Sequence, residues 1–181
     1  MTLLIVGLAL WYASHLFKRL MPARRAAMGD RGKMLATALS LASIVLMVIG
    51  YRGAAEVALW TPPAFMIHIN NLLMVVAFWL FAASGTRAWP SARMRHPMLI
   101  GLKTWAVAHL LVNGDLASVV LFGGMLGYGV IAVILINRAE PDWTPPVPGK
   151  AAALKTAVGT AVALAVVIGI HTWLGYPTYP R

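Results

Sequence analysis

Six long apolar runs separated by short polar segments account for most of the chain's 181 residues. Each run approaches the length at which an α-helix crosses a hydrocarbon core about 30 Å thick. The runs are unbroken and do not alternate residue by residue, so they favour helices over the strands of a membrane barrel. The predicted spans are residues 2–17, 34–51, 68–84, 97–112, 116–137 and 151–173. We therefore predict an all-α, polytopic membrane bundle of about six transmembrane helices.

The composition supports this prediction. Hydrophobic residues make up 60% of the chain and charged residues 11%, whereas soluble domains carry about 25% charged residues. The segments between the runs are too short to fold separately, so we predict a single domain over residues 1–181. The chain has no cysteine, which excludes disulfides, thiolate metal sites and thiol nucleophiles.

The Lys and Arg residues are distributed unequally between the predicted loops. Thirteen of the fifteen fall in or beside alternate loops, and only Arg52 and Arg181 remain for the opposite side. The thirteen are Lys18, Arg19, Arg24, Arg25, Arg31, Lys33, Arg87, Arg93, Arg95, Lys103, Arg138, Lys150 and Lys155. Because loops rich in Lys and Arg stay in the cytoplasm, both termini are predicted to lie outside. No basic stripe with interleaved aromatics stands apart from these loops, so the net charge of +10 does not indicate nucleic-acid binding.

Two details in and before the fifth run predict local structure. Gly123 and Gly127 form a G-x-x-x-G pair, which permits close approach to a neighbouring helix. In the tract before this run, Gly114 is predicted to end one helix in the left-handed conformation, and Asp115 to cap the next. This structural reading of Asp115 is favoured over a catalytic one.

Histidine is the residue type that carries the candidate chemistry. Nucleotide-binding and hydrolase motifs are absent, and all five acidic residues fall in predicted loops or at span ends. His15, His68, His96, His109 and His171 lie within or at the ends of the spans. Ionisable groups inside lipid are costly and usually face a partner, a cavity or a cofactor. A packing or interfacial role is the alternative for each histidine taken singly.

Spacing limits which histidines share a site. His96 and His109 are thirteen residues apart, which is roughly 220° around a helix, so the two do not share one metal. His109 is expected to share its face with Trp105 and Asn113, each four residues away. A second grouping towards the outer side contains His68, His109 and His171.

The run from His96 to Asp115 closely resembles the signature of the NnrU family of membrane proteins. Its pattern is H-P, a glycine, then W-x-x-x-H-L-L-x-N-G-D. The resemblance continues to Gly124 and includes three other short tracts, so it spans almost the whole chain. These tracts are residues 14–15, 59–63 and 171–175.

This resemblance implies both a process and a cofactor. Bacterial members are associated with denitrification, in particular with nitrite and nitric oxide reductase function. The related plant zeta-carotene isomerase carries haem b, and its proposed axial histidines match His15 and His109. The chain differs from the plant enzyme at residues 113–115, so haem is more readily carried over than isomerase activity.

We accordingly expect an NnrU-like protein of the bacterial inner membrane that binds haem b in a redox or accessory role. His15 and His109 are the expected ligands, with Lys103, Trp105 and Asn113 as neighbours. Either pairing with a haem propionate or snorkelling to the membrane surface explains Lys103. His68 and His171 are the alternative ligands. One alternative function is a haem-dependent cis–trans isomerase acting on an apolar, carotenoid-like polyene. Another is a cofactor-free assembly factor for respiratory nitrogen-oxide reductases.

Overall fold

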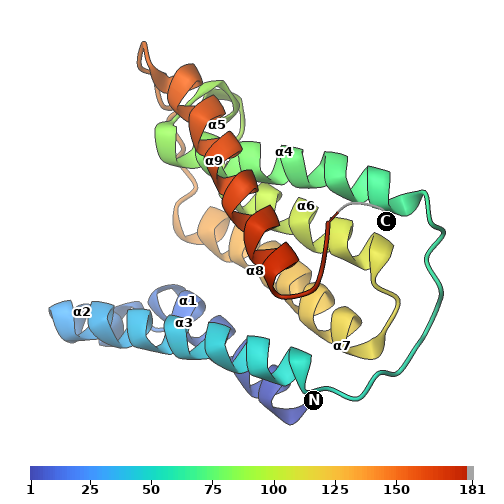
Figure 1. Cartoon of the computed structure of the whole chain (residues 1–181). Helices are drawn as coiled ribbons and strands as arrows, with labels where there is room; N and C mark the ends of the chain where they lie inside the picture. The colour runs from blue at the N-terminus through green and yellow to red at the C-terminus, as the bar shows by residue number, and fades with distance from the viewer. Residues whose placement is uncertain (179–181) are drawn as a thin grey trace. The chain divides into compact units, whose positions relative to one another are not determined.

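A computed structural model of the chain describes residues 1–178, whose regular structure is helical apart from one isolated bridge, between Ala58 and Asp115. Figure 1 traces the elements in chain order. They are α1 (Thr2–Leu20), α2 (Pro22–Ala27), α3 (Gly29–Arg52), α4 (Met66–Thr86), α5 (Trp89–Arg93), α6 (Pro97–Val112), α7 (Leu116–Ser118), the π-helix η1 (Val119–Gly123), α8 (Gly124–Ala139) and α9 (Ala152–Trp173).

Five helical segments are long and apolar enough to cross a membrane, with α7, η1 and α8 forming one of them. The sixth, α6, is a shorter apolar helix of 16 residues, about 24 Å long at 1.5 Å per residue. These helices confirm the predicted all-α, multi-pass membrane protein. The helix that contains the second predicted span is longer than that span, since α3 starts at Gly29 and takes Asp30 into its first turn.

The chain divides into two compact units. The first contains Met1–Thr61 and Asn113–Pro141, and the second contains Pro62–Val112 and Asp142–Arg181. Of the second unit, the structure describes residues up to 178. That the two units make up a single domain stays a prediction.

In the first unit, α1 packs closely against α3 through glycines. A Cβ atom on Gly7 would lie 2.8 Å from the backbone nitrogen of Met47, and one on Gly50 would collide with the backbone of Leu4. These pairings, which run in opposite senses along the two helices, make α1 and α3 antiparallel. The closest helix contact in this unit therefore depends on glycines outside the predicted G-x-x-x-G pair.

The G-x-x-x-G prediction is wrong for one of its two glycines. A Cβ on Gly123 would meet no atom within 4 Å, whereas one on Gly127 would lie 3.1 Å from the Tyr12 hydroxyl. Gly124 approaches α1 instead, since its Cβ would lie 3.0 Å from the side chain of Leu8. The π-helix η1 ends at Gly123, and its wider turn changes the face that each following residue presents.

In the second unit, α4 packs against both α6 and α9. At one end of α4 the hydroxyls of Thr86 and Thr156 are 2.6 Å apart. At the other end the Asn71 amide donates a hydrogen bond of 2.8 Å to the Thr178 carbonyl. The start of α9 therefore lies beside the end of α4, so the two helices are antiparallel.

Candidate histidine site

Three of the five histidines make the same kind of hydrogen bond within their own helices. The Nδ1 atoms of His15, His109 and His171 lie 3.0, 3.0 and 2.9 Å from the backbone carbonyl oxygen four residues earlier in their helices. A carbonyl oxygen only accepts hydrogen bonds, so in a neutral imidazole the proton must sit on Nδ1. The lone pair is then on Nε2, which is the arrangement of a histidine prepared to bind a metal or haem iron.

His15 lies on α1 among aromatic rings of the first unit. Its imidazole stacks on Trp11 with the ring centroids 3.9 Å apart and meets the edge of Tyr128 at 5.6 Å. The Ser14 hydroxyl lies 2.9 Å from its Nδ1 and accepts a hydrogen bond from Ser40 at 3.1 Å. These contacts fix the orientation of the ring, although the side chain as a whole is exposed.

His109 lies in the second unit, three residues before the end of α6. Its ring lies beside Trp105, with centroids 5.2 Å apart and planes inclined by 50°. Gly101 of α6 faces Ala77 and Phe81 of α4, and His109 is eight residues further on, about 12 Å along the axis. Figure 1 shows α6 running antiparallel to α4, so His109 comes level with the first turns of α4.

His171 reaches the same end of the unit on α9. Gly159 faces Ala82 of α4, and His171 is twelve residues beyond Gly159, about 18 Å along the axis. This again corresponds to the first turns of α4. His109 and His171 therefore lie towards the same end of the second unit. We call this part of the second unit the histidine end.

Two adjacent amides of α4 lie at the histidine end, and sequence reasoning missed both. Asn70 donates a hydrogen bond of 3.0 Å to Asn71, which donates in turn to the Thr178 carbonyl. The side-chain oxygen of Asn70 is buried and has no hydrogen-bond partner among residues 1–178. Buried amides without partners are costly. The signal was present in the sequence, as a pair of amides within an apolar span.

The other candidate residues are placed less favourably for a shared site. His68 is exposed, and among residues 1–178 no group of three or more His, Asp or Glu side chains is arranged to hold a metal ion. The grouping of His68, His109 and His171 as ligands stays a prediction. The carbonyl of His96 accepts from Ile100 at the start of α6, which is a structural role for that residue's backbone.

Lys103 and Asn113 fall at opposite ends of α6. Lys103 lies in its second turn, and α6 ends at Val112, before Asn113. Asn113 directly follows the last residue of α6, and its expected place near His109 stays a prediction. Trp105 is thus the predicted neighbour that the structure brings to His109.

The sequence was compared with models of known protein families. The family model described as "NnrU protein" matches residues 3–178, which is nearly the whole chain. The chain belongs to the NnrU family. Searches among curated proteins and among solved structures gave no match to this NnrU protein.

Two of the tracts by which the sequence resembles NnrU proteins contact each other in the first unit. The backbone nitrogens of Leu59 and Trp60 donate to the Gly114 carbonyl at 2.7 and 3.1 Å, and Leu116 donates to Val57 at 2.9 Å. A Cβ atom on Gly114 would collide with the Trp60 carbonyl. The glycine is therefore required by close contact. The left-handed prediction was wrong, since Gly29 and Gly175 are the glycines with positive φ among residues 1–178.

Asp115 of the same NnrU tract has the structural role predicted from the sequence. Its carboxylate accepts from the Ser118 backbone nitrogen at 2.9 Å and from the Ser118 hydroxyl at 2.5 Å. The Tyr51 hydroxyl lies 2.8 Å from the Ser118 hydroxyl and extends the network to α3. These bonds cap α7 and join the loop to the first unit, which confirms the capping prediction.

Proposed function

We propose that this NnrU protein binds haem b within the membrane and serves a redox or accessory role in nitrite and nitric oxide reduction. The observation that carries the proposal is the hydrogen bond from Nδ1 to a backbone carbonyl in His15, His109 and His171, because it leaves the lone pair of a neutral imidazole on Nε2. When bound, haem iron supplies one-electron chemistry at a potential set by its axial ligands and their surroundings. The link to nitrogen-oxide respiration rests on the family.

His109 is the first residue that we assign to holding the haem. Its ring is oriented by the Trp105 carbonyl and flanked by the Trp105 indole. Two histidines compete for the second position. His15 is implied by the family resemblance alone, because it belongs to the other unit. His171 is supported by its place at the histidine end of the second unit, to which His109 also belongs.

The test is a reduced-minus-oxidised absorbance spectrum of the protein purified in detergent from cells supplied with haem precursor. We expect the spectrum of haem b in the wild type and its loss in His109→Ala. Loss in His15→Ala with retention in His171→Ala assigns the second ligand to His15, and the reverse result assigns it to His171. The matched control is His68→Ala, an exposed histidine at the start of α4, which should keep the full spectrum.

Two results would replace the proposal. A folded, haem-supplied wild type without absorbance would favour the cofactor-free assembly factor. Conversion of a supplied carotenoid between cis and trans isomers would favour the isomerase. The role in denitrification is tested separately, by deleting the gene and measuring nitrite and nitric oxide turnover in intact cells and in their solubilised reductases.

We also propose that the protein lies in the bacterial cytoplasmic membrane with both termini on the periplasmic side. The alternation of Lys and Arg between loops supports this orientation. A C-terminal alkaline phosphatase fusion should be active, whereas a C-terminal fusion that fluoresces only in the cytoplasm should be dark. The opposite pair of results would reverse the topology.

A further inference from the structure

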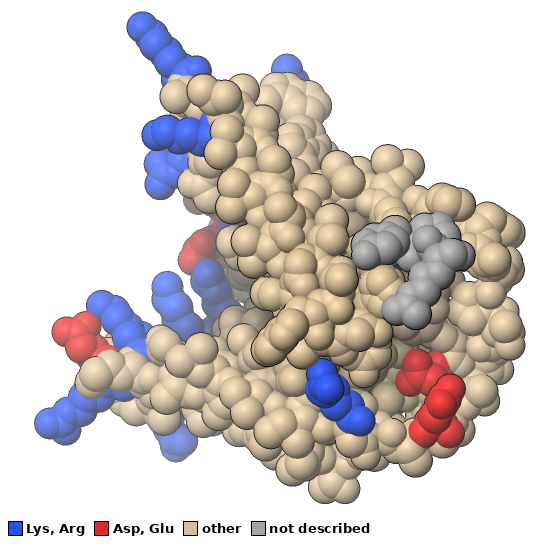
Figure 2. All heavy atoms as spheres, in the orientation of Figure 1, with Lys and Arg blue, Asp and Glu red and all other residues tan. Residues whose placement is uncertain are grey.

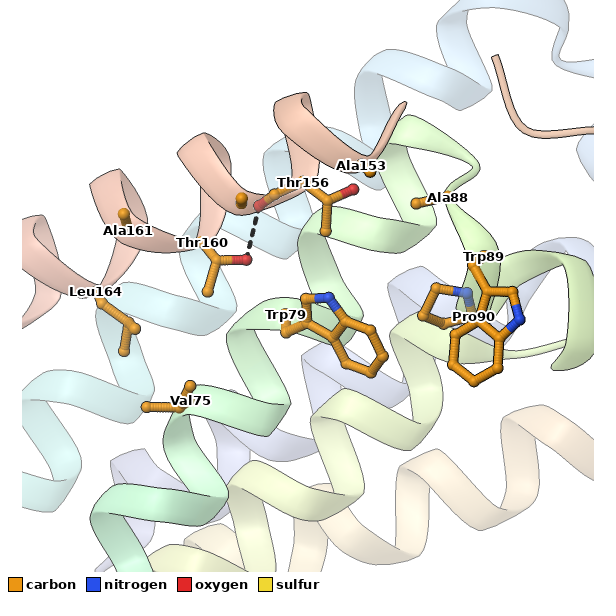
Figure 3. A pocket seen from close by; sticks show the side chains of 11 residues that line it. Val75, Trp79, Ala88, Trp89, Pro90, Ala153, Thr156, Thr160, Ala161 and Leu164 are labelled. Atoms are coloured by element: carbon orange, nitrogen blue, oxygen red, sulfur yellow. Dashed lines mark hydrogen bonds between the residues drawn. The ribbon is translucent and has the colours of Figure 1, made fainter. Parts of the chain in front are cut away.

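An apolar groove opens on the second unit between α4, α5 and α9. It has a volume of about 370 Å³, within the range of roughly 300–1,000 Å³ found for ligand pockets. Figure 3 shows Trp79 of α4 and Trp89 of α5 on one side and the alanines and threonines of α9 along the other. All the lining residues belong to the second unit.

The groove exists because small residues of α9 stand opposite large rings. Ala153, Ala157 and Ala161 recur at intervals of four residues and leave the space beside α9 unfilled. The two tryptophan rings, with centroids 6.4 Å apart, form the opposite wall. The walls are therefore mostly carbon.

The hydroxyl groups of α9 do not make the groove polar. Thr156 donates to the Ala152 carbonyl and Thr160 to the Thr156 carbonyl, both at 2.8 Å. The bond from Thr160 is drawn as a dashed line in Figure 3. With these donors used within the helix, the groove suits a hydrocarbon chain.

The second unit is strongly basic. The described residues of this unit include six Lys and Arg side chains but a single carboxylate, Asp142. Figure 2 shows Lys and Arg side chains gathered where α5 and the start of α9 lie. The six are Arg87, Arg93, Arg95, Lys103, Lys150 and Lys155. This excess of positive charge attracts an anion.

Two of these cations lie beside the groove. Ala88, which lines the groove, packs with Ala83 and Ala152 in one buried cluster. Arg87 directly precedes Ala88, and Lys150 precedes Ala152 by two residues. Packing of the alanines therefore brings both basic residues to the same end of the groove, and both side chains are exposed.

We propose that the groove binds one acyl chain of an anionic phospholipid, whose phosphate lies against Arg87 and Lys150. An apolar channel with cations at one end matches a molecule that carries its negative charge at one end of a hydrocarbon chain. Basic pockets between membrane helices bind anionic head groups in this way. This site is separate from the histidine end and does not depend on haem.

The experiment is native mass spectrometry of the protein released from detergent micelles containing equal amounts of palmitoyl-oleoyl phosphatidylglycerol and phosphatidylcholine. We expect one phosphatidylglycerol to be retained in preference to phosphatidylcholine. Arg87→Asn and Lys150→Gln should each reduce this preference about fivefold, as expected for about 1 kcal/mol per cation near anionic lipid. Asparagine is chosen because Arg87 has φ 55°, a conformation that asparagine tolerates.

Matched controls separate groove binding from general attraction. Ala157→Trp should fill the groove and abolish retention of the lipid, whereas Val158→Trp, at a residue that is 54% exposed outside the groove, should not. Arg31→Gln removes an exposed cation from the first unit and should leave the preference unchanged. Should Ala157→Trp fail to elute as a folded protein, Ala161→Leu fills the same groove with a smaller side chain.

Equal retention of both lipids by the wild type would overturn the proposal. So would equal behaviour of the Ala157→Trp and Val158→Trp proteins, because the groove would then have no part in binding. Preference for free phosphate over phosphatidylglycerol in a competition would show that the cations act without the apolar channel, and would also refute it.

Discussion

Replacing Gly114 tests the contact between the two loop tracts of the first unit. A Cβ atom at this position would collide with the Trp60 carbonyl, which is backbone and cannot turn away as a side chain would. The loop carrying Leu59 and Trp60 must then move from Gly114. That movement breaks the two hydrogen bonds that their backbone nitrogens donate to the Gly114 carbonyl.

The magnitude follows from these two bonds. A typical intramolecular hydrogen bond contributes about 0.5–1.5 kcal/mol net, so the two together contribute about 1–3 kcal/mol. Alanine recovers about 0.4–1 kcal/mol by restricting the unfolded chain. Taking the midpoint of each range, we expect Gly114→Ala to lower the free energy of unfolding by about 1.3 kcal/mol. Unfolding in mixed micelles with increasing SDS, followed by circular dichroism, measures the difference.

Gly114→Asn decides between the two explanations for the glycine. Asparagine tolerates the left-handed conformation but has a Cβ atom, so steric collision predicts that it destabilises as much as alanine does. The control is Gly123→Ala, where a new Cβ would meet nothing within 4 Å, and stability should hold or rise. If Gly114→Asn were as stable as the wild type while Gly114→Ala was not, the collision argument would be refuted.

Three further substitutions test the packing and capping of the first unit in the same assay. Asp115→Ala removes the acceptor for the Ser118 backbone nitrogen and should cost about 0.5–2 kcal/mol, whereas Asp115→Asn should retain most of that stability. Gly50→Ala places a methyl group against the backbone of Leu4 and should cost about 1–3 kcal/mol. Tyr12→Phe removes a hydrogen bond of 2.6 Å to the Gly124 carbonyl and should cost about 0.5–1.5 kcal/mol.

Each of these three predictions can be contradicted by a specific result. Equal losses for Asp115→Ala and Asp115→Asn would show that the carboxylate charge, and not the cap, matters. Gly85→Ala is the control for Gly50, since its Cβ would meet no atom within 4 Å. Because alanine is the better helix former, a similar loss at both sites would show that the contact with Leu4 is not its cause. If Tyr12→Phe left the free energy of unfolding unchanged, the hydrogen bond to the Gly124 carbonyl would contribute no more than a bond to water.

The helices could be predicted from the sequence because lipid imposes one requirement on every spanning segment. A backbone without water must bond to itself, so length and apolarity alone identify a span. This is why α6 was predicted with its observed bounds, 97–112. The early start of α3 was missed because helices continue into water, where polar residues such as Asp30 no longer mark an end.

Local chemistry was equally accessible from the sequence. The Asp115 cap involves residues three apart, and such a bond needs no knowledge of the rest of the fold. The hydrogen bond from His109 to the Trp105 carbonyl is also local, although sequence reasoning identified only that the two residues share a face. Membership of the NnrU family follows from residues 3–178 taken as a sequence.

Tertiary structure decided everything that depends on which residues meet across helices. Gly50 and Leu4 approach closely because α1 and α3 pack with one particular register, which no pattern within either helix specifies. His109 and His171 come to one end because α6 and α9 both run antiparallel to α4. The composition of a span determines that it crosses the membrane, because burial in lipid stabilises every apolar side chain in a similar way. It does not fix its neighbours, because lipid and protein are equally apolar and only shape selects between them.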